Sequence, residues 1–487
     1  MPLLDEPVVP PAAAPSVEGP LVQQLGSGLQ AEEVFETLSG LPNAVFFDSA
    51  MRHSTLGRYS YVAADPFDWW TVPADGQPAI EPAMLRVNRW RVEPIAGLPP
   101  WQGGAALLFG YEVGRSLERL DRPRWDEFRQ PALAAGLYDT AVLFDHATDR
   151  AWAVSHGFPE PPGASRQRRA ESRLAELLER LRRPPARCAR GPREELLASA
   201  LAPQHATPYG RGVTSDFSRD GYLRAVDRVV ERLRAGVAFQ VNLSQRLLTP
   251  APADPVAAYL RLRERNPAPF SAYLDGGAWQ VASASPERFL RVTGASVETR
   301  PIKGTRPLPG GAEDRRRSAA ALCASEKDRA ENVMIVDLLR NDLSRVAVDA
   351  SVDVPTLFGV EEYAHVQHLV SVVTAQLRDG AGVGDLLAAT LPGGSITGAP
   401  KVSAQQIIAS REPTSRGAYC GSLACVGFPE PDGRQAMDSS VLIRTITLAG
   451  GWAQAPVGGG VVVQSDPVAE YDETWHKAAG LIDAVAP

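Results

Sequence analysis

The sequence has few cysteines and no long apolar run. Four cysteines among 487 residues are too few for a disulfide framework, and none belongs to a CxxC pair of the kind that binds zinc. No apolar stretch is long enough to span a bilayer, and the N-terminus lacks the basic-then-apolar order of a signal peptide. These absences argue against a membrane-spanning or secreted protein and favour the reduced cytoplasm.

An excess of positive charge is also missing. The net charge is −7, and no basic patch with interleaved aromatic residues occurs, so we expect no nucleic-acid partner. The glycine-rich stretches match neither a P-loop nor a dinucleotide-binding fingerprint, which argues against a nucleotide cofactor. A small anionic substrate stays compatible with the charge, because a local site can be positive on an acidic protein.

Composition changes along the chain predict four regions. Hydrophobic residues make up 44% of the sequence, which is ample for a large core. Residues 1–18 are rich in Pro and Ala and predict a disordered tail. Residues 19–182 alternate short apolar runs with Gly and Pro. Residues 183–213 carry Pro, Arg and Gly without periodicity, which predicts an exposed linker before the more strongly patterned region 214–487.

Local periodicity predicts the secondary structure of both large regions. Short apolar or alternating segments predict strands at 46–47, 59–62, 105–109, 141–144, 239–244, 279–285 and 288–292. Helical spacing of apolar residues predicts helices over 164–182, 220–235, 325–346 and 466–485. Gly236 is placed to end the second helix, while Asp466 suits the N-cap and Pro467 the first turn of the last. Runs of strands with inserted helices, without regular βαβ units, predict an α+β fold.

Two of the predicted helices carry acidic residues on one face. Asp328 and Glu331 are three residues apart, and Glu470, Glu473 and Lys477 follow the same helical spacing. Acids near a helix N-terminus favour the macrodipole, and Glu473 with Lys477 is an ordinary i,i+4 pair, so spacing alone fits a surface role. The functional alternative is a Mg²⁺ site whose oxygen ligands come from both helices.

Loops and isolated charged residues offer further candidates. Residues 391–401 are dense in glycine and hydroxyl groups, and the glycines at 458–460 precede an apolar run; such loops either bind an anion through backbone N–H groups or form tight turns. Lys303 lies in an apolar strand-turn, where a desolvated amine would be a nucleophile and a solvated one only a surface charge. Glu287, between two predicted strands, is a general acid if burial raises its pKa, or else an exposed turn residue.

Taken together, these segments resemble the chorismate-utilising enzymes. The resemblance is continuous over about 214–485, and its motifs are FQVNLSQR at 239–246, SPERF at 285–289, RPIKGTRP at 300–307, DRAENVMIVDLLRND at 328–342, HLVS at 368–371, GGSITGAPK at 393–401, YCG at 419–421 and the segment 458–477. It implies a large intertwined β-sandwich with helices packed outside. The N-terminal part is less similar, but the segment around Ser49 resembles the family's tryptophan pocket, which is either a binding site or a purely structural feature.

Three features are similar to the branch of the family that aminates chorismate at C4, the aminodeoxychorismate synthases. Gln240 stands where the water-adding members carry a lysine, and Lys303 stands where anthranilate synthases typically carry alanine. Asn242 and residues 394–397 also look more like the C4-aminating branch. The alternatives are the large subunit of anthranilate synthase, in which Lys303 would be a bystander, and a regulator that binds chorismate or tryptophan without turnover.

The resemblance implies a role for each catalytic residue. Glu287 would protonate the departing C4 hydroxyl, Lys303 would add at C2 until ammonia displaces it by attack at C4, and His368 would assist near the ring. Mg²⁺ would be held by Glu331 and Glu473, with Glu470 and Asp328 close behind. Asp328 replaces a glutamate of many relatives, which makes it a doubtful direct ligand. Residues expected to bind the substrate are Tyr419, Arg444, Gly458, Gly459, Gly460, Lys477, Ser395 and Thr397.

The source of ammonia lies outside this sequence. None of the four cysteines stands in the G-x-C-x-G setting of a glutaminase nucleophile. Ammonia would therefore come from solution or, as the resemblance implies, from a separate glutamine amidotransferase subunit.

Overall fold

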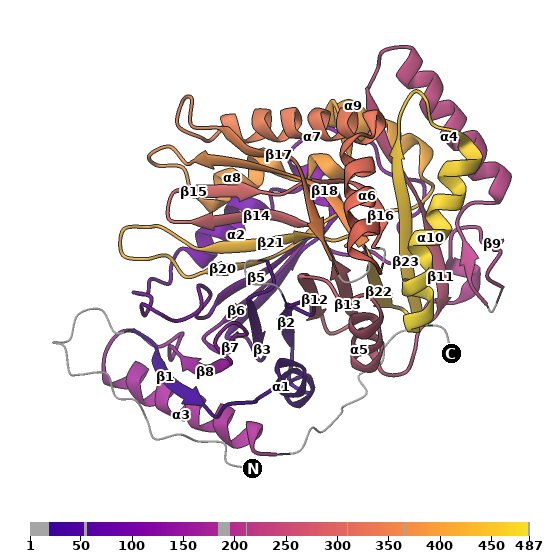
Figure 1. Cartoon of the computed structure of the whole chain (residues 1–487). Coiled ribbons are helices and arrows are strands. Elements are labelled where there is room, and N and C mark those ends of the chain that lie inside the picture. Colours follow the sequence, from indigo (N-terminus) through magenta and orange to yellow (C-terminus); the bar gives the residue numbers. More distant parts are fainter. Residues whose placement is uncertain are drawn as a thin grey trace.

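Two antiparallel sheets and the helices around them make up the protein (Figure 1). The computed structural model describes residues 19–52, 56–183, 195–210, 212–308, 310–363 and 366–485. The tail predicted at residues 1–18 lies outside the described residues. The expected α+β fold with large sheets and flanking helices is confirmed.

In the described part of the chain, the larger sheet has thirteen strands. Their order is β1 (Leu21–Leu25), β8 (Arg150–Ser155), β7 (Thr140–Asp145), β3 (Tyr59–Ala63), β2 (Val45–Asp48), β12 (Phe270–Asp275), β13 (Trp279–Ser285), β22 (Thr445–Ala449), β23 (Trp452–Val461), β11 (Gln240–Pro250), β10 (Thr214–Ser215) and β9 (His205–Ala206), with β19 (Gly398–Ala399) paired to β11.

The smaller sheet has ten strands within the described ranges. Their order is β16 (Ile302–Pro307), β18 (Val366–Gln376), β15 (Ser296–Thr299), β14 (Arg288–Thr293), β21 (Met437–Val441), β20 (Ser422–Gly427), β5 (Gly104–Phe109), β6 (Leu133–Tyr138) and β4 (Asp68–Val72), with β17 (Asp353–Glu362) paired to β18. Side chains of both sheets, such as Leu143 and Leu108, meet in one core between them.

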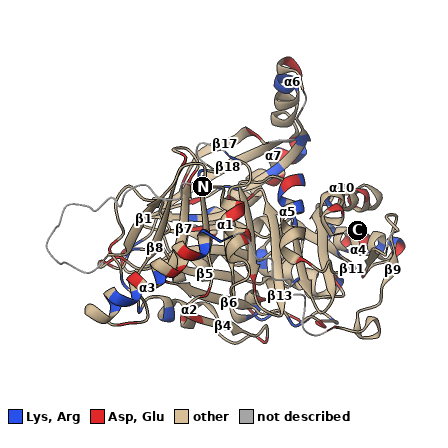
Figure 2. Ribbon diagram, turned by 90° about the horizontal axis from the view of Figure 1, so that it is seen from below, with Lys and Arg blue, Asp and Glu red and all other residues tan. Residues whose placement is uncertain are grey.

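Helices cover the outer faces of the sheets. A second core joins the larger sheet to α1 (Ala31–Leu38), α3 (Ala164–Leu181), α5 (Pro255–Arg265) and α10 (Pro467–Val485). A third core, centred on the smaller sheet, includes α2 (Ile80–Val87), α4 (Arg219–Arg234), α7 (Glu326–Ser344), α8 (Val383–Thr390) and α9 (Lys401–Arg411). Helix α6 (Ala312–Cys323) stands out from the body and buries only Leu322 (Figure 2). Among the described helices none has the length and apolarity that crossing a bilayer needs.

The helix ends follow the sequence signals closely. Helix α10 starts at Pro467, and Asp466 accepts a hydrogen bond from the backbone of Ala469 at 2.9 Å, as an N-cap does. Helix α4 is capped by Ser218 and ends before Gly236, whose φ of 73° is the left-handed conformation that glycine adopts readily. The strand predicted at 239–244 is longer than expected, because β11 continues its pairing with β23 as far as Pro250.

Part of the stretch predicted as an exposed linker is packed against the body. The Leu196 backbone N–H donates to Gly450 O at 2.8 Å, and the Trp452 indole donates to Leu196 O at 2.9 Å. Leu201 and Ala202 are buried, and the short strand β9 extends the larger sheet. Residues 195–210 therefore belong to the fold, although such short paired segments leave no periodic pattern in the sequence.

The two long regions predicted from composition share both sheets. Strand β2 of the N-terminal region pairs with β12 of the C-terminal region, and β5 pairs with β20. Strands from sequence positions several hundred residues apart thus lie side by side, which gives the intertwined arrangement expected from the resemblance. Either region, if folded alone, would leave exposed the sheet edges that the strands of the other region cover.

Gly104 tests how tightly these two regions are joined. Its φ is 137°, and a Cβ added there would lie 2.2 Å from Val426 O on β20. Gly97 has a φ of 85°, but a Cβ there would meet nothing within 4 Å. We expect Gly97→Ala to lower the free energy of unfolding by about 1–2 kcal/mol through backbone strain alone, and Gly104→Ala to lose about 1–3 kcal/mol more through overpacking. Urea denaturation measures both; equal losses would contradict the close approach.

Candidate active site

Lys303 is turned inward by an irregularity in its strand. The pairing of β16 with β18 shifts register between Ile302 and Thr305, and Gly304 has a φ of 79°. Such irregularities re-aim side chains at sheet edges. The Lys303 ammonium nitrogen donates to Ser395 O at 3.0 Å. Burial lowers the pKa of Lys303, while the negative charges of nearby carboxylates, Glu287 first among them, oppose that change.

Glu287 lies beside Lys303 in the connection between β13 and β14. Its side chain is buried, with 5% of the residue exposed. Burial raises the pKa of Glu287 to about 7, although hydrogen bonds from the Ser395 side chain and the Ile302 backbone and the charge of Lys303 act in the opposite direction. A large share of this carboxyl therefore carries a proton at neutral pH, so Glu287 is no exposed turn acid and can donate that proton.

The glycine- and hydroxyl-rich loop connects Lys303 to the larger sheet. Ser395, in the 3₁₀ turn η3 (Gly394–Ile396), accepts a second hydrogen bond from the Asn242 side chain on β11 at 3.1 Å. Thr397 differs from the expectation that it faces the substrate. Its hydroxyl is fully buried and donates to Gly393 O at 2.9 Å, so it closes the loop internally.

The acidic residues of α7 and α10 act on one another. Burial raises the pKa of Glu331 and of Glu470, and their mutual negative charge contributes to the pKa of Glu331. Burial acts to raise the pKa of Glu473 as well, but the Lys477 ammonium at 2.6 Å outweighs it and the pKa falls. Three carboxylates from two helices therefore lie in one electrostatic neighbourhood, and Lys303 adds its charge to the same set.

The three glycines at 458–460 make room for these groups. A Cβ on Gly459 would lie 3.2 Å from the Glu470 carboxylate and 3.5 Å from that of Glu473. Gly458 uses its carbonyl to accept a hydrogen bond from Lys477 at 2.8 Å. A Cβ on Gly460 would lie 2.1 Å from the buried Gln240 amide. Strand β23 therefore needs glycine here to let side chains approach its backbone closely.

The acids are compatible with a divalent cation but do not form a complete cage. The Glu331 Oε1 atom is buried and has no hydrogen-bond partner. Over the described ranges, no three His, Cys, Asp or Glu side chains lie close enough to hold a metal ion by themselves. Asp328 lies against Gly304, beside Lys303. Mg²⁺ commonly takes one or two carboxylates and completes its shell with substrate oxygens and water, so the prediction of Mg²⁺ stays open.

His368 lies on β18, the strand that pairs with the strand of Lys303, and Arg444 lies near it on the connection between β21 and β22. His368 Nδ1 shares a hydrogen bond of 2.8 Å with the Thr305 hydroxyl, and its Nε2 is buried without a partner. Burial and the charge of Arg444 lower the pKa of His368 to about 3, so the ring is neutral. Tyr363, which the sequence did not single out, packs its ring edge-on against His368 at 4.8 Å.

Tyr419 and Arg444 stand on two connections that hydrogen-bond to each other. Cys420 donates its backbone N–H to Leu442 O at 2.8 Å, and Leu442 donates back to Gly421 O at 2.9 Å. Burial lowers the pKa of Arg444, and its guanidinium forms no ion pair with any residue that the structure describes. A largely desolvated guanidinium without an ion pair suits an anionic ligand. Tyr419 is buried on the connection that is hydrogen-bonded to that of Arg444.

A buried arginine that the sequence did not reveal holds this site together. Arg416 donates to both oxygens of Glu412 at 2.8 and 2.7 Å. Its guanidinium also donates to Ile396 O at 3.1 Å and to Asn242 O at 2.8 Å. It thereby fixes the loop that carries Ser395 against strand β11.

Comparison with known proteins bears directly on this arrangement. Residues 76–483 match the family model described as chorismate binding enzyme. The chain belongs to this family. It is 37% identical to the aminodeoxychorismate synthase component 1 of Escherichia coli over 93% of this chain and 95% of that protein. It is 38% identical to the anthranilate synthase component 1 of Streptomyces coelicolor over 96% of this chain and 88% of that protein.

Solved structures of the family share the fold. The anthranilate synthase component I of Streptococcus pneumoniae matches with a TM-score of 0.73 and 28% identity, covering 88% of this chain and 93% of that one. The menaquinone-specific isochorismate synthase of Escherichia coli matches with a TM-score of 0.70 at 18% identity, over 97% and 95% of the two chains. The protein is therefore an enzyme of the chorismate-binding family with that family's sandwich of sheets.

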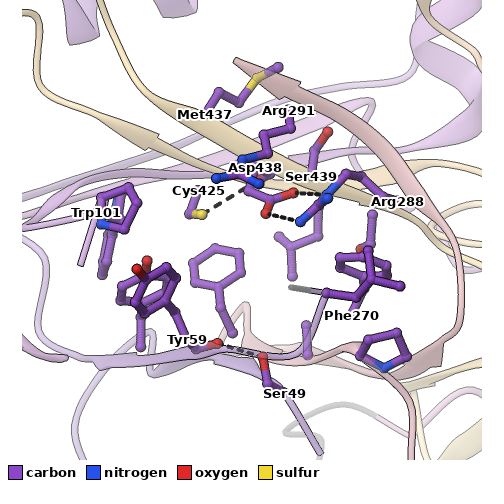
Figure 3. Close-up of a pocket in the computed structure, with 18 of the residues that line it drawn as sticks. Ser49, Tyr59, Trp101, Phe270, Arg288, Arg291, Cys425, Met437, Asp438 and Ser439 are labelled. Carbon is purple, nitrogen blue, oxygen red and sulfur yellow. Dashed lines mark hydrogen bonds and ion pairs between the residues drawn. The ribbon is translucent and has the colours of Figure 1, made fainter. Parts of the chain in front are cut away.

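A cavity lies between the two sheets, away from Lys303. It encloses about 820 Å³, including space open to solvent, and Ser49 stands in its wall (Figure 3). The Ser49 hydroxyl donates to Tyr59 O at 2.5 Å. Trp101 and Phe270 contribute aromatic surface from opposite sides. The segment that resembles a tryptophan pocket thus lines a real cavity, separate from the lysine site.

An ion network centred on the buried Arg288 lines one wall of this cavity. Arg288 donates to both oxygens of Asp438, at 3.0 and 2.9 Å, and to Glu298 at 3.0 Å. Its guanidinium lies over the Phe270 ring at 4.8 Å. Arg288 directly follows Glu287, so one residue belongs to the lysine site and the next lines the cavity between the sheets.

Glu287 gives a pH-dependent contribution to stability. Its pKa rises from 4.5 in the unfolded chain to about 7 in the folded one, so the folded state binds the extra proton between these values. Stability from this group is complete below about pH 4.5 and is lost as pH rises through about 7. Glu287→Gln removes that loss. The free energy of unfolding of the variant, minus that of the parent, should therefore rise by up to about 3 kcal/mol from pH 5 to pH 8, as measured by urea denaturation. For the control Glu264→Gln, at an exposed residue of α5, this difference should not change with pH. A difference that does not change with pH for Glu287→Gln would contradict the burial of Glu287.

Proposed function

We propose that this enzyme aminates chorismate at C4, forming 4-amino-4-deoxychorismate with ammonia from a separate glutamine amidotransferase subunit. Relatives of the C4-aminating and C2-aminating kinds match at 37% and 38% identity, so overall similarity does not separate them. The observation that carries the proposal is the pair Lys303 and Glu287, which share Ser395 as a hydrogen-bonding neighbour in a buried site.

The pair can perform a two-step substitution. Protonated Glu287 gives its proton to the C4 hydroxyl, which leaves as water while the lone pair of the neutral Lys303 amine forms a bond to C2 and the ring double bonds shift. Ammonia then forms a bond to C4, the double bonds shift back, and the bond between C2 and Lys303 breaks. On addition, Lys303 passes one N–H proton to the Glu287 carboxylate that has just given up its own. The proton that the attacking ammonia loses at C4 goes to the lysine nitrogen, which leaves as a neutral amine. Both groups start neutral, which is the less costly charge state for a buried pair.

Positive groups around the pair suit a dianionic substrate. Arg444 has no ion-pair partner among the described residues, and Tyr419 lies on the connection bonded to its own. We assign these two to the enolpyruvyl carboxylate, where a guanidinium fork matches the geometry of the anion. Lys477 adds positive charge near the ring carboxylate, beside the backbone of Gly458.

Mg²⁺ is the cofactor that the acidic residues suit. Glu331 and Glu473 would hold it, with Glu470 and Asp328 close behind. The ion would neutralise these carboxylates and hold the ring carboxylate of chorismate among them. The support is the buried Glu331 oxygen, which has no hydrogen-bond partner and only a distant ion pair with Lys327 at 3.9 Å, and the mutual charge of Glu331 and Glu470, which a cation would relieve.

Neither of the two buried cysteines is suited to be a glutaminase nucleophile. Cys420 is buried, and burial raises the pKa of its thiol to about 11. Burial raises the pKa of the Cys425 thiol further. Neither would be a thiolate at neutral pH, which a glutaminase nucleophile must be. This supports delivery of ammonia by another subunit, in keeping with the words "component 1" in the names of the relatives.

Tryptophan is the ligand we propose for the cavity between the sheets. Its aromatic wall offers stacking surface for an indole, and the carboxylates of Asp438 and Glu298 beside Arg288 offer both charge signs to an amino acid's head group. Resemblance of the Ser49 segment to the tryptophan pocket of the family supports the same ligand. Binding in this cavity would leave the lysine site accessible.

Lys303 gives the most direct test of the proposed reaction. With chorismate, ammonium and Mg²⁺, the native chain should form 4-amino-4-deoxychorismate, and Lys303→Ala should slow that reaction by about 10³-fold or more because the nucleophile is gone. Lys303→Arg should give no rescue, because a guanidinium keeps its proton. Mass spectrometry identifies the product and any trapped adduct on Lys303. Undiminished formation of 4-amino-4-deoxychorismate by Lys303→Ala, or anthranilate as the native product, would sink the proposal.

Metal dependence is tested at the two helices. Glu331→Gln and Glu473→Gln should each remove turnover, because each deletes a charged oxygen ligand, while far-ultraviolet circular dichroism shows an intact fold. Activity measured against free Mg²⁺ after treatment with EDTA should fall to background and return on adding the ion. Glu326→Gln, exposed at the start of α7, serves as the control and should keep the native Mg²⁺ dependence. Full activity in EDTA would rule the metal out.

A further inference from the structure

Large apolar side chains are exposed together at one corner of the molecule. Five of the eleven such side chains in the described part of the chain belong to it, and we call this set the corner patch: Val237, Phe239, Val402, Val463 and Val468. Phe239 is the extreme case, with 70% of the residue exposed. Scattered apolar residues are normal on a surface, but a cluster indicates an interaction site.

The fold brings these residues together from four segments. Phe239 donates its backbone N–H to Ala399 O at 2.7 Å, which places it beside the start of α9 and Val402. The pairing of β11 with β23 ends at Val241 and Val461, so Phe239 and Val463 each lie two residues beyond the same end of that ladder. Helices α4 and α10 pack against each other at the same end of the sheet (Figure 1).

Arginines without partners border the corner patch. Arg228 and Arg232 are one turn apart on the exposed face of α4, and Val237 donates its backbone N–H to Arg232 O at 3.1 Å. Arg411, at the end of α9, feels the positive charge of both, and its Nε atom has no hydrogen-bond partner. None of the three forms an ion pair with a residue inside the described ranges. The charge of Glu231 offsets these arginines only in part, and positive charges without ion pairs are complementary to an acidic surface.

The corner patch also adjoins the active site. Gln240 follows Phe239 and is fully buried, with its side-chain amide against the backbone of Gly460. Glu470 and Glu473 stand in the first turns of α10, directly after Val468. A molecule seated on the corner patch would therefore lie at the strand and helix ends that carry site residues.

We propose that the corner patch and its arginine border are the docking surface for the ammonia-supplying glutamine amidotransferase subunit, through an acidic-rimmed apolar face of that subunit. This inference rests on the proposed function, since only an aminating enzyme needs such a partner. An apolar centre bordered by arginine is the composition of a specific protein interface, with an exposed aromatic as its anchor. Docking beside the site would also shorten the distance that ammonia travels before it meets chorismate.

Phe239→Glu tests the surface in the full-length chain. The control is Leu197→Glu, which places the same charge at an equally exposed apolar residue, 71% against 70%, outside the corner patch. The partner used is the purified glutamine amidotransferase subunit of the same organism, and titration calorimetry measures its binding. We expect Phe239→Glu to weaken binding and glutamine-driven turnover at least about tenfold, because it buries a charge at the interface centre, while turnover with ammonium and the behaviour of Leu197→Glu stay native.

A charge reversal provides a second variant. Arg228→Glu with Arg232→Glu should slow association and make binding less sensitive to salt, because the border is then no longer attractive to an acidic face. Native binding by both variants would overturn the proposal. So would a finding that the native chain alone is a dimer and Phe239→Glu a monomer, since a second copy would then occupy the corner patch. If the subunit binds here but the native product is anthranilate, the docking surface stands and the C4 assignment falls.

Discussion

The buried guanidinium of Arg416 is the interaction on which the site depends. Taking a charge out of water costs several kcal/mol unless the protein surrounds it with good partners, and removing one partner of such a pair costs about 3–5 kcal/mol. Arg416 is buried, yet each of its three guanidinium nitrogens donates to an acceptor in Glu412, Ile396 or Asn242. Glu412 in turn accepts from the Ser244 backbone at 2.8 Å, so one ion pair joins α9, the loop of Ser395 and strand β11.

The N-terminal region completes this network. Both oxygens of Glu112 accept backbone hydrogen bonds, from Arg416 at 2.9 Å and Gly417 at 3.0 Å, and the Tyr111 ring lies 4.5 Å from the Arg416 guanidinium. Residues that contribute no catalytic group thereby hold the segment leading to Tyr419. Lys303 takes its acceptor, Ser395 O, from the loop that Arg416 fixes, so the position of the nucleophile depends on an ion pair distant from it in sequence.

Features set by residues close together in the sequence could be predicted, and features set by contacts between distant residues could not. Helices α7 and α10 and strands β13 and β14 followed from local periodicity, and cap residues placed the helix ends within one or two positions. Lys303, Glu287 and the acids were found because they sit in motifs that keep their order in the family. Arg416 with Glu112 was not, because their contact spans 304 residues and neither stands in a recognisable pattern. The packed segment at 195–210 was missed for the same reason: its partners, such as Gly450, lie far along the chain.

The lysine site and the cavity between the sheets meet at the peptide that joins Glu287 to Arg288, and that constrains both. Glu287, in the connection before β14, faces Lys303, while Arg288, the first residue of β14, lines the cavity. Arg288 is held by Asp438 and Glu298 and stacked on Phe270, so its backbone has little freedom. The Glu287 backbone is held on the other side, where its carbonyl accepts from Val441 N at 3.1 Å. The carboxyl can therefore stay buried beside Lys303 at a pKa near neutrality, because rigid neighbours prevent it from turning toward water to ionise. The ion network beside the cavity thus holds in place the backbone that carries the protonated Glu287.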